Sequence, residues 1–81
     1  MRELLSIRQT TTVLEYAERF EQAKHRVLVH NPNIDDVFFV QKFLNGLNYS
    51  ISNAITLHKL RTVDGALSLA LMQEDLLEAF Y

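Results

Sequence analysis

Histidine side chains in this sequence could bind a metal ion. His25 and His30 are five residues apart, whereas two ligands on one face of a helix are usually four apart. The chain has no Cys, and no neighbouring pair of carboxylates completes a ligand set. We therefore expect these histidines to have structural or surface roles, and we predict neither a metal site nor a cofactor.

Acid–base and nucleophilic chemistry have equally little support. The acidic residues of one stretch, Glu15, Glu18 and Glu21, are interspersed with Arg19 and Lys24, which is typical of a solvated helix face with weak ion pairs. No surrounding motif would activate Ser6, Ser50, Ser52 or Ser68 as a nucleophile, and no Gly-rich loop could bind phosphates. We predict that the protein is not an enzyme. A cofactor-free enzyme would need a pocket of clustered titrating side chains.

Charge and composition favour a single small domain. The 81 residues are 48% hydrophobic and 22% charged, with a net charge of -2, so no broad positive field would hold a nucleic acid. The short basic run Lys24–Arg26 fits the last turn of a helix, where cations complement the helix dipole. No apolar run is as long as a membrane span. We expect no direct contact with nucleic acid or membrane.

Local signals predict four helices at about 12–29, 34–45, 50–59 and 63–80, after an extended segment at 1–11. Thr12 and Glu15 have the spacing of a capping box, and Pro32 ends the first helix. Asn33 or Asp35 can cap the second helix, and Gly46 is expected to end it in the left-handed conformation. Ser50 is the expected cap of the third. The fold class predicted is therefore an all-α, four-helix domain.

Periodicity assigns the buried faces. Apolar residues recur at steps of three and four in the first helix and in the last helix. The expected core positions are Val13, Tyr16, Ala17, Phe20, Ala23 and Val27, together with Val63, Ala66, Leu67, Ala70, Leu71 and Leu77.

The stretch DDVFFVQKFLNGL contains two adjacent phenylalanines, which a helix directs about 100° apart. The pattern places its apolar sector on Val37, Val40, Phe43, Leu44 and Leu47. Phe38 then falls among polar residues and Phe39 at the sector's margin. Either a later helix covers both rings, or they form an exposed aromatic patch that binds protein.

Three segments together resemble the capsid region of Gag from gypsy-class long-terminal-repeat retrotransposons. They are SIRQTTTVLEYAERFEQ, FLNGL and LRTVDGALSLALMQE, and they cover almost the whole chain. The first is also similar to the major homology region of retroviral capsid C-terminal domains, through Ile7-Arg8-Gln9 and Arg19-Phe20. It differs by having Thr10 in place of a glycine and a segment two residues shorter.

The resemblance implies a fold like that of retroviral capsid C-terminal domains, and a set of residues like the homology region: Gln9, Glu15, Tyr16, Arg19 and Phe20. Gln9 would tie the extended N-terminal segment to the helical body through a buried or half-buried amide. Whether Glu15 has a role beyond capping stays open.

The resemblance also implies a function in self-association. In that family the second helix meets its symmetry mate, so the expected dimer interface is Asp35, Phe38, Phe39, Gln41 and Lys42. The expected partners are a second copy, the capsid lattice and the N-terminal capsid lobe of a longer Gag, within a cytoplasmic virus-like particle that holds the element's RNA. The alternative is a host-adopted Gag that uses this fold as a dimerisation or protein-binding module.

Overall fold

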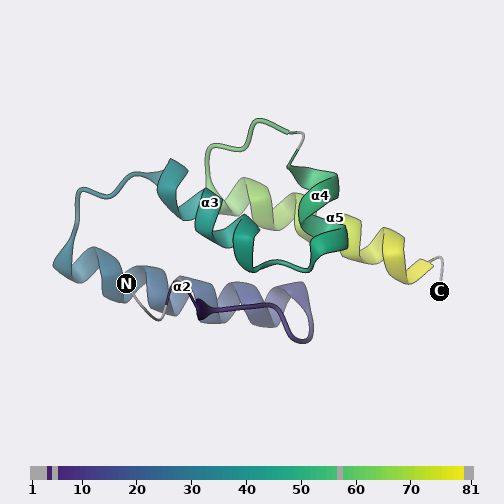
Figure 1. Cartoon of the computed structure of the whole chain (residues 1–81), viewed down its shortest axis with the longest axis horizontal. Coiled ribbons are helices and arrows are strands. Elements are labelled where there is room, and N and C mark those ends of the chain that lie inside the picture. Colours follow the sequence, from purple (N-terminus) through teal and green to yellow (C-terminus); the bar gives the residue numbers. More distant parts are fainter. Residues whose placement is uncertain (1–3, 5, 57, 80–81) are drawn as a thin grey trace.

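The computed structural model describes residues 4, 6–56 and 58–79, and the regular structure within them is helical (Figure 1). The helices are α2 (Val13–His30), α3 (Asp36–Gly46), α4 (Tyr49–Ile55) and α5 (Val63–Ala79). Among the described residues there is no strand. The prediction of an all-α, four-helix domain is confirmed.

Helix α5 is the element on which the others pack. It contacts α2, α3 and α4, and in Figure 1 it passes behind α3 and α4 while α2 runs along the lower edge of the view. The Cα atoms extend 42 × 25 × 15 Å. Because packed helices lie about 8–10 Å apart and a helix's Cα cylinder is about 4.6 Å across, the shortest extent corresponds to two helix layers.

The core forms where α2, α3 and α5 meet, and the aromatic rings of Tyr16, Phe20 and Phe43 pack together in it. The ring centroids of Tyr16 and Phe20 are each 5.1 Å from that of Phe43. All six expected core positions of α2 are buried, which confirms the prediction for Tyr16 and Phe20. The buried hydrophobic residues are Leu4, Val13, Tyr16, Ala17, Phe20, Ala23, Val27, Phe39, Val40, Phe43, Leu47, Ile51, Ile55, Val63, Ala66 and Ala70.

Only half of the core positions predicted for the last helix are buried. Val63, Ala66 and Ala70 are buried. Leu67, Leu71 and Leu77 are partly buried and pack against the core. α5 carries apolar residues around much of its circumference, so its neighbours cover only one side of it.

Helix starts agree with the local signals in two of three cases. The Thr12 hydroxyl accepts a hydrogen bond from the Glu15 amide at 3.2 Å, and an Asp35 carboxylate oxygen accepts one from the Phe38 amide at 3.1 Å. The expected Ser50 cap of α4 is wrong. Asn48 is the cap instead, because its side-chain oxygen accepts from the Ser50 amide at 2.9 Å.

Two predicted boundaries also need correction. α4 ends at Ile55 rather than near residue 59, since the chain turns there with the His58 amide bonded to the Ile55 carbonyl at 3.1 Å. The N-terminal segment is not extended throughout, because Leu4 and Ser6 have helical backbone. Residues 1–3 and 5 lie outside the described residues.

Gly46 has a different role from the one predicted. It is the last residue of α3 and does not adopt a positive φ. A Cβ atom at this position would lie 2.2 Å from the Tyr16 hydroxyl oxygen and 2.6 Å from the Ile7 carbonyl oxygen. Glycine is needed here because two other segments approach the α3 backbone closely.

We therefore predict that Gly46→Ala lowers the free energy of unfolding by about 1–3 kcal/mol, as an overpacked core does. The matched control is Gly65→Ala in α5, where the new Cβ would lie 3.3 Å from the Thr62 hydroxyl oxygen. We expect that control to change stability by no more than about 1 kcal/mol, because Ala's higher helix propensity offsets the tight contact. Urea denaturation of the three proteins measures both effects, and equal midpoints for the two variants would contradict the close-approach interpretation.

Candidate functional site

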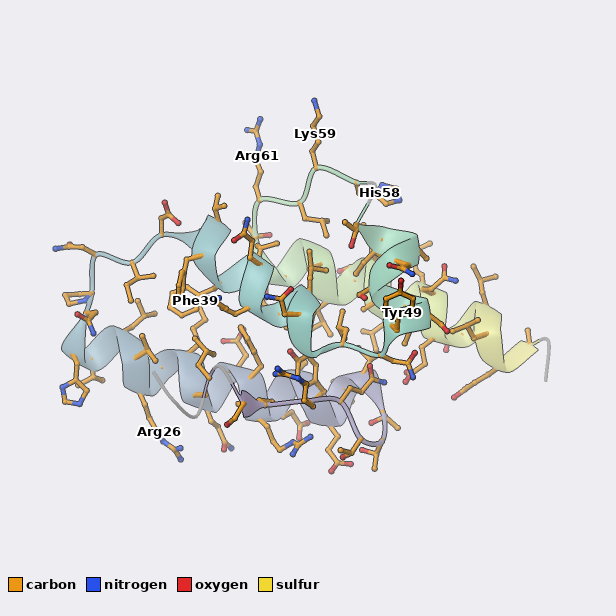
Figure 2. All side chains as sticks on the ribbon, in the orientation of Figure 1. Arg26, Phe39, Tyr49, His58, Lys59 and Arg61 are labelled. Carbon is orange, nitrogen blue, oxygen red and sulfur yellow. The ribbon has the colours of Figure 1, made fainter. Side chains whose placement is uncertain are left out.

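The two adjacent phenylalanines of α3 have different environments. Phe39 is only 1% exposed and lies between α3 and α2 (Figure 2), where the Lys24 ammonium nitrogen is 5.3 Å from its ring centroid. Phe38 is half-buried and packs against the edge of the core. The prediction that Phe39 belongs to an exposed contact surface is therefore wrong, because Phe39 is part of the core.

The buried face of α3 is rotated from the predicted sector. Phe39, Val40 and Phe43 are buried, whereas Val37 is 54% exposed and Leu44 is half-buried. Helix α3 packs on both α2 and α5, so its inner face is centred near Phe43. This rotation brings Phe39 inward and turns Val37 outward, contrary to the prediction.

The outward side of α3 carries the remaining predicted interface residues, with Val37 added. We call this set the α3 surface: Asp35, Val37, Phe38, Gln41 and Lys42. Asp35 and Gln41 are exposed. The Lys42 ammonium nitrogen lies 5.4 Å from the Phe38 ring centroid, a distance suitable for a cation–π contact. The surface thus combines an exposed aliphatic side chain, the accessible part of an aromatic ring and a few polar groups.

A shallow hollow of about 300 Å³ adjoins the α3 surface. Its described lining is Gln41, Leu44 and Asn45 of α3, and Thr56 after α4. The amide and hydroxyl groups of this lining can hydrogen-bond to a peptide backbone.

Gln9 fastens the N-terminal segment to the junction of α3 and α4. Its backbone amide donates to the Gly46 carbonyl at 2.7 Å, and its side-chain oxygen accepts from the Asn48 amide at 2.9 Å. The side-chain nitrogen donates to the Thr11 carbonyl at 3.1 Å. The predicted half-buried amide that ties this segment to the helical body is confirmed in its geometry.

The other charged residues of the homology-like set lie next to the same segment. An Arg19 guanidinium nitrogen donates to the Arg8 carbonyl at 2.9 Å. A Glu15 carboxylate oxygen accepts from the Thr11 hydroxyl at 2.7 Å. Glu15 and Gln9 are therefore linked through Thr11, so Glu15 takes part in holding the segment besides following the Thr12 cap.

Sequence reasoning missed two residues that position this site. Asn48 receives the Gln9 bond and caps α4, and its residue type, a preferred helix cap, was a usable signal. Glu74 of α5 accepts a hydrogen bond from the Val13 amide at 2.9 Å, so a residue 61 positions away satisfies a free amide in the first turn of α2. No local pattern could have indicated this second contact.

Other kinds of site find little support in the described part of the chain. It contains no group of three or more His, Asp or Glu residues that could hold a metal ion, and none of its helices is long and apolar enough to cross a membrane. Lys59 and Arg61 project from the loop between α4 and α5, whereas Arg26 projects from α2 on the other side of the molecule (Figure 2). These cations do not form one continuous stripe.

Comparison of the chain with family models, curated proteins and solved structures finds no match.

Tyr16 gives the site a testable pH dependence. Its hydroxyl donates to the Phe43 carbonyl at 2.8 Å in the core. Burial raises the pKa of Tyr16 above its ordinary value of 10.0, although Arg8 and Arg19 act in the opposite direction. Above pH 10 the phenol ionises in the unfolded chain but stays neutral in the folded one, so stability present below that pH is lost as pH rises.

We predict that the free energy of unfolding falls by up to about 1.4 kcal/mol per pH unit above pH 10 because of this group. Tyr16→Phe should be about 1–3 kcal/mol less stable at neutral pH, because the Phe43 carbonyl loses its partner, and its alkaline decline should be shallower. Urea denaturation at several pH values measures both. Parallel pH profiles for the two proteins would show that Tyr16 does not carry the effect.

For Glu74 we predict that Glu74→Ala costs about 0.5–2 kcal/mol, the range for losing a helix cap. Glu74→Gln should cost less, because the amide oxygen can still accept from Val13. Glu78→Ala is the matched control, since Glu78 is exposed on the same helix. Thermal unfolding ranks the three variants, and an equal effect of Glu74→Ala and Glu78→Ala would remove the capping role.

Proposed function

We propose that this chain is a structural self-association module, of the type found in the capsid C-terminal domain of gypsy-class retrotransposon Gag. Its partners would be a second copy of itself and the N-terminal capsid lobe of a parent Gag, within a particle that holds RNA. The observation that carries the proposal is the α3 surface, where Val37 is 54% exposed beside the half-buried ring of Phe38. An aliphatic and an aromatic side chain exposed together are typical of a surface that binds protein.

The bonds of Gln9 support the resemblance. The resemblance to the major homology region implies a Gln that holds the N-terminal segment against the helical body, and Gln9 bonds to both Gly46 and Asn48. These contacts hold the C-terminal end of α3. A helix fixed at one end against the core presents its outward side with little loss of conformational entropy on association.

The contact proposed is small, so a weak dimer is expected. Helix α3 has 11 residues, a length of about 16 Å, and one pair of such helices covers less than the standard area of a stable interface. Weak contacts suit a closed shell, because many of them acting together stabilise a particle while each stays reversible.

A second candidate is a host-adopted module that binds a peptide of another protein. The hollow lined by Gln41, Leu44, Asn45 and Thr56 favours it, because the polar side chains of this lining could hydrogen-bond to an extended backbone. Self-association that is independent of added peptide favours the first candidate.

We predict that the protein associates with itself as its concentration rises, and that Val37→Asp weakens this association through α3 while leaving the domain folded. The exposed side chain can carry a charge without entering the core, but two such charges would face each other across a two-fold contact. Phe38→Asp should weaken both association and stability. Phe39→Asp should unfold the domain, because it buries an unpaired charge. Sedimentation measures mass and circular dichroism measures folding.

The matched control is Val29→Asp, which places the same charge on an exposed position of α2. It should associate like the unmodified protein. If Val37→Asp also associates like the unmodified protein, the α3 surface is not the contact.

A further inference from the structure

Helix α5 has a second apolar side that the described part of the domain leaves largely uncovered. Away from its buried residues runs a row that we call the α5 stripe: Gly65, Leu69, Met72, Leu76 and Ala79. Met72 is 62% and Leu76 53% exposed, while Leu69 is half-buried at the edge of the core. Since the domain is only two helix layers thick, the outward side of α5 faces away from the other helices.

The spacing of the α5 stripe is that of a helix that packs on another helix. Its members follow one another at steps of four, three, four and three residues, the repeat that keeps an apolar seam facing a partner helix. A helix exposed to water on that side would normally carry charged residues there, yet the stripe itself has none. The pattern therefore indicates a helical partner.

Charges on the molecule indicate how that partner is oriented. Helix α5 contains Asp64, Glu74, Asp75 and Glu78 but no Lys or Arg, so its C-terminal half is acidic. The loop just before its N-terminus carries Lys59 and Arg61, which project from the body (Figure 2). Two α5 helices packed antiparallel bring the acidic half of each copy to the positive helix end and basic loop of the other. A parallel pair would place both acidic halves side by side.

We propose that the α5 stripe binds the α5 stripe of a second copy, antiparallel, with a two-fold axis at Met72. The sizes of the side chains fit this symmetry. Leu69 would meet Leu76 of the other copy, and Gly65 would meet Ala79, so bulky residues pair near the centre and small ones at the ends. Asp75, at the margin of the stripe, would lie near Ser68 of the other copy and not near its like-charged counterpart.

This contact stands on α5 alone and is separate from the α3 surface. Its consequence for assembly rests on the proposed function. One two-fold contact produces a closed dimer, whereas two different two-fold contacts on one chain can join copies into an extended array. A chain with both the α3 surface and the α5 stripe therefore has the two contacts that a lattice requires.

Cysteine cross-linking tests the geometry of the pair, because the chain has no native Cys. Met72→Cys should form a disulfide-linked dimer under mild oxidation, since the two residues would meet at the axis. A mixture of Leu69→Cys and Leu76→Cys should cross-link to each other faster than either does to itself. The control is Val29→Cys, at an exposed position of α2. Cross-linking of Met72→Cys no faster than this control would overturn the proposal, and self-linking of Leu69→Cys as fast as the mixed pair would overturn the antiparallel arrangement.

Charge substitution at the axis gives an independent test in solution. Met72→Lys and Met72→Glu should each weaken the association through α5 by roughly tenfold or more, because like charges meet at the axis. Both should stay folded by circular dichroism, since Met72 is exposed. An equimolar mixture of the two should associate again as a heterodimer. The proposal fails if either variant alone associates like the unmodified protein, or if the mixture associates no better than its components.

The Val37→Asp background separates the two contacts. With the α3 surface disabled, a dimer that is lost on adding Met72→Lys is the α5 pair. If Val37→Asp is monomeric at every concentration, and the double variant Val37→Asp with Met72→Cys does not cross-link, the α5 contact is refuted while the α3 proposal stays intact. If Val37→Asp still associates and Met72→Lys abolishes that association, the α5 contact is supported.

Discussion

The hydroxyl group of Tyr16 must find a hydrogen-bond partner inside the core, and the rest of the structure depends on how it does so. It donates to the Phe43 carbonyl, which fixes the position of α3 against α2. The tyrosine oxygen then occupies the space where a side chain at residue 46 would stand, so only glycine fits. The missing side chain also admits the Ile7 carbonyl, and the neighbouring Gln9 amide bonds to the Gly46 carbonyl. A buried hydroxyl without a partner would cost about 1–3 kcal/mol, a large fraction of a small domain's stability.

This contact also decides which side of α3 is free. With Phe43 held against Tyr16 and Phe20, its neighbour one turn earlier, Phe39, is buried toward α2, while Val37 turns to the surface. The Phe38 and Phe39 rings still touch edge-to-face, with centroids 5.6 Å apart. Of these two adjacent phenylalanines, Phe39 thus lies in the core and Phe38 at its edge. A charge introduced at Phe39 would therefore affect folding, whereas a charge at the neighbouring Phe38 would also affect the surface contact.

The sequence could predict those features that depend on neighbouring residues. Thr12 and Asp35 cap their helices as their residue types and spacing indicate, and the core face of α2 follows from its period. The rotation of α3 was not predictable in this way, because it depends on Tyr16, a residue 27 positions from Phe43. The same holds for Glu74, whose partner Val13 is 61 positions away, and for Gly46, whose type suggested a left-handed end when the real constraint was space. Gln9 was predicted through the family resemblance, not from its neighbours.

A chain of 81 residues buries only about 60% of the surface that its unfolded form exposes, and here the two-layer arrangement leaves much apolar surface on α5 and some on α3. A third layer would cover the α5 stripe, but the described part of the chain supplies none. Association with another copy would cover that surface and add to stability as protein concentration rises. Since the proposed two-fold contacts on α3 and α5 would use different sides of the molecule, neither would block the other. The small size of the core and a tendency to assemble would then have one cause, which is that α5 has apolar residues around more of its circumference than its three neighbouring helices bury.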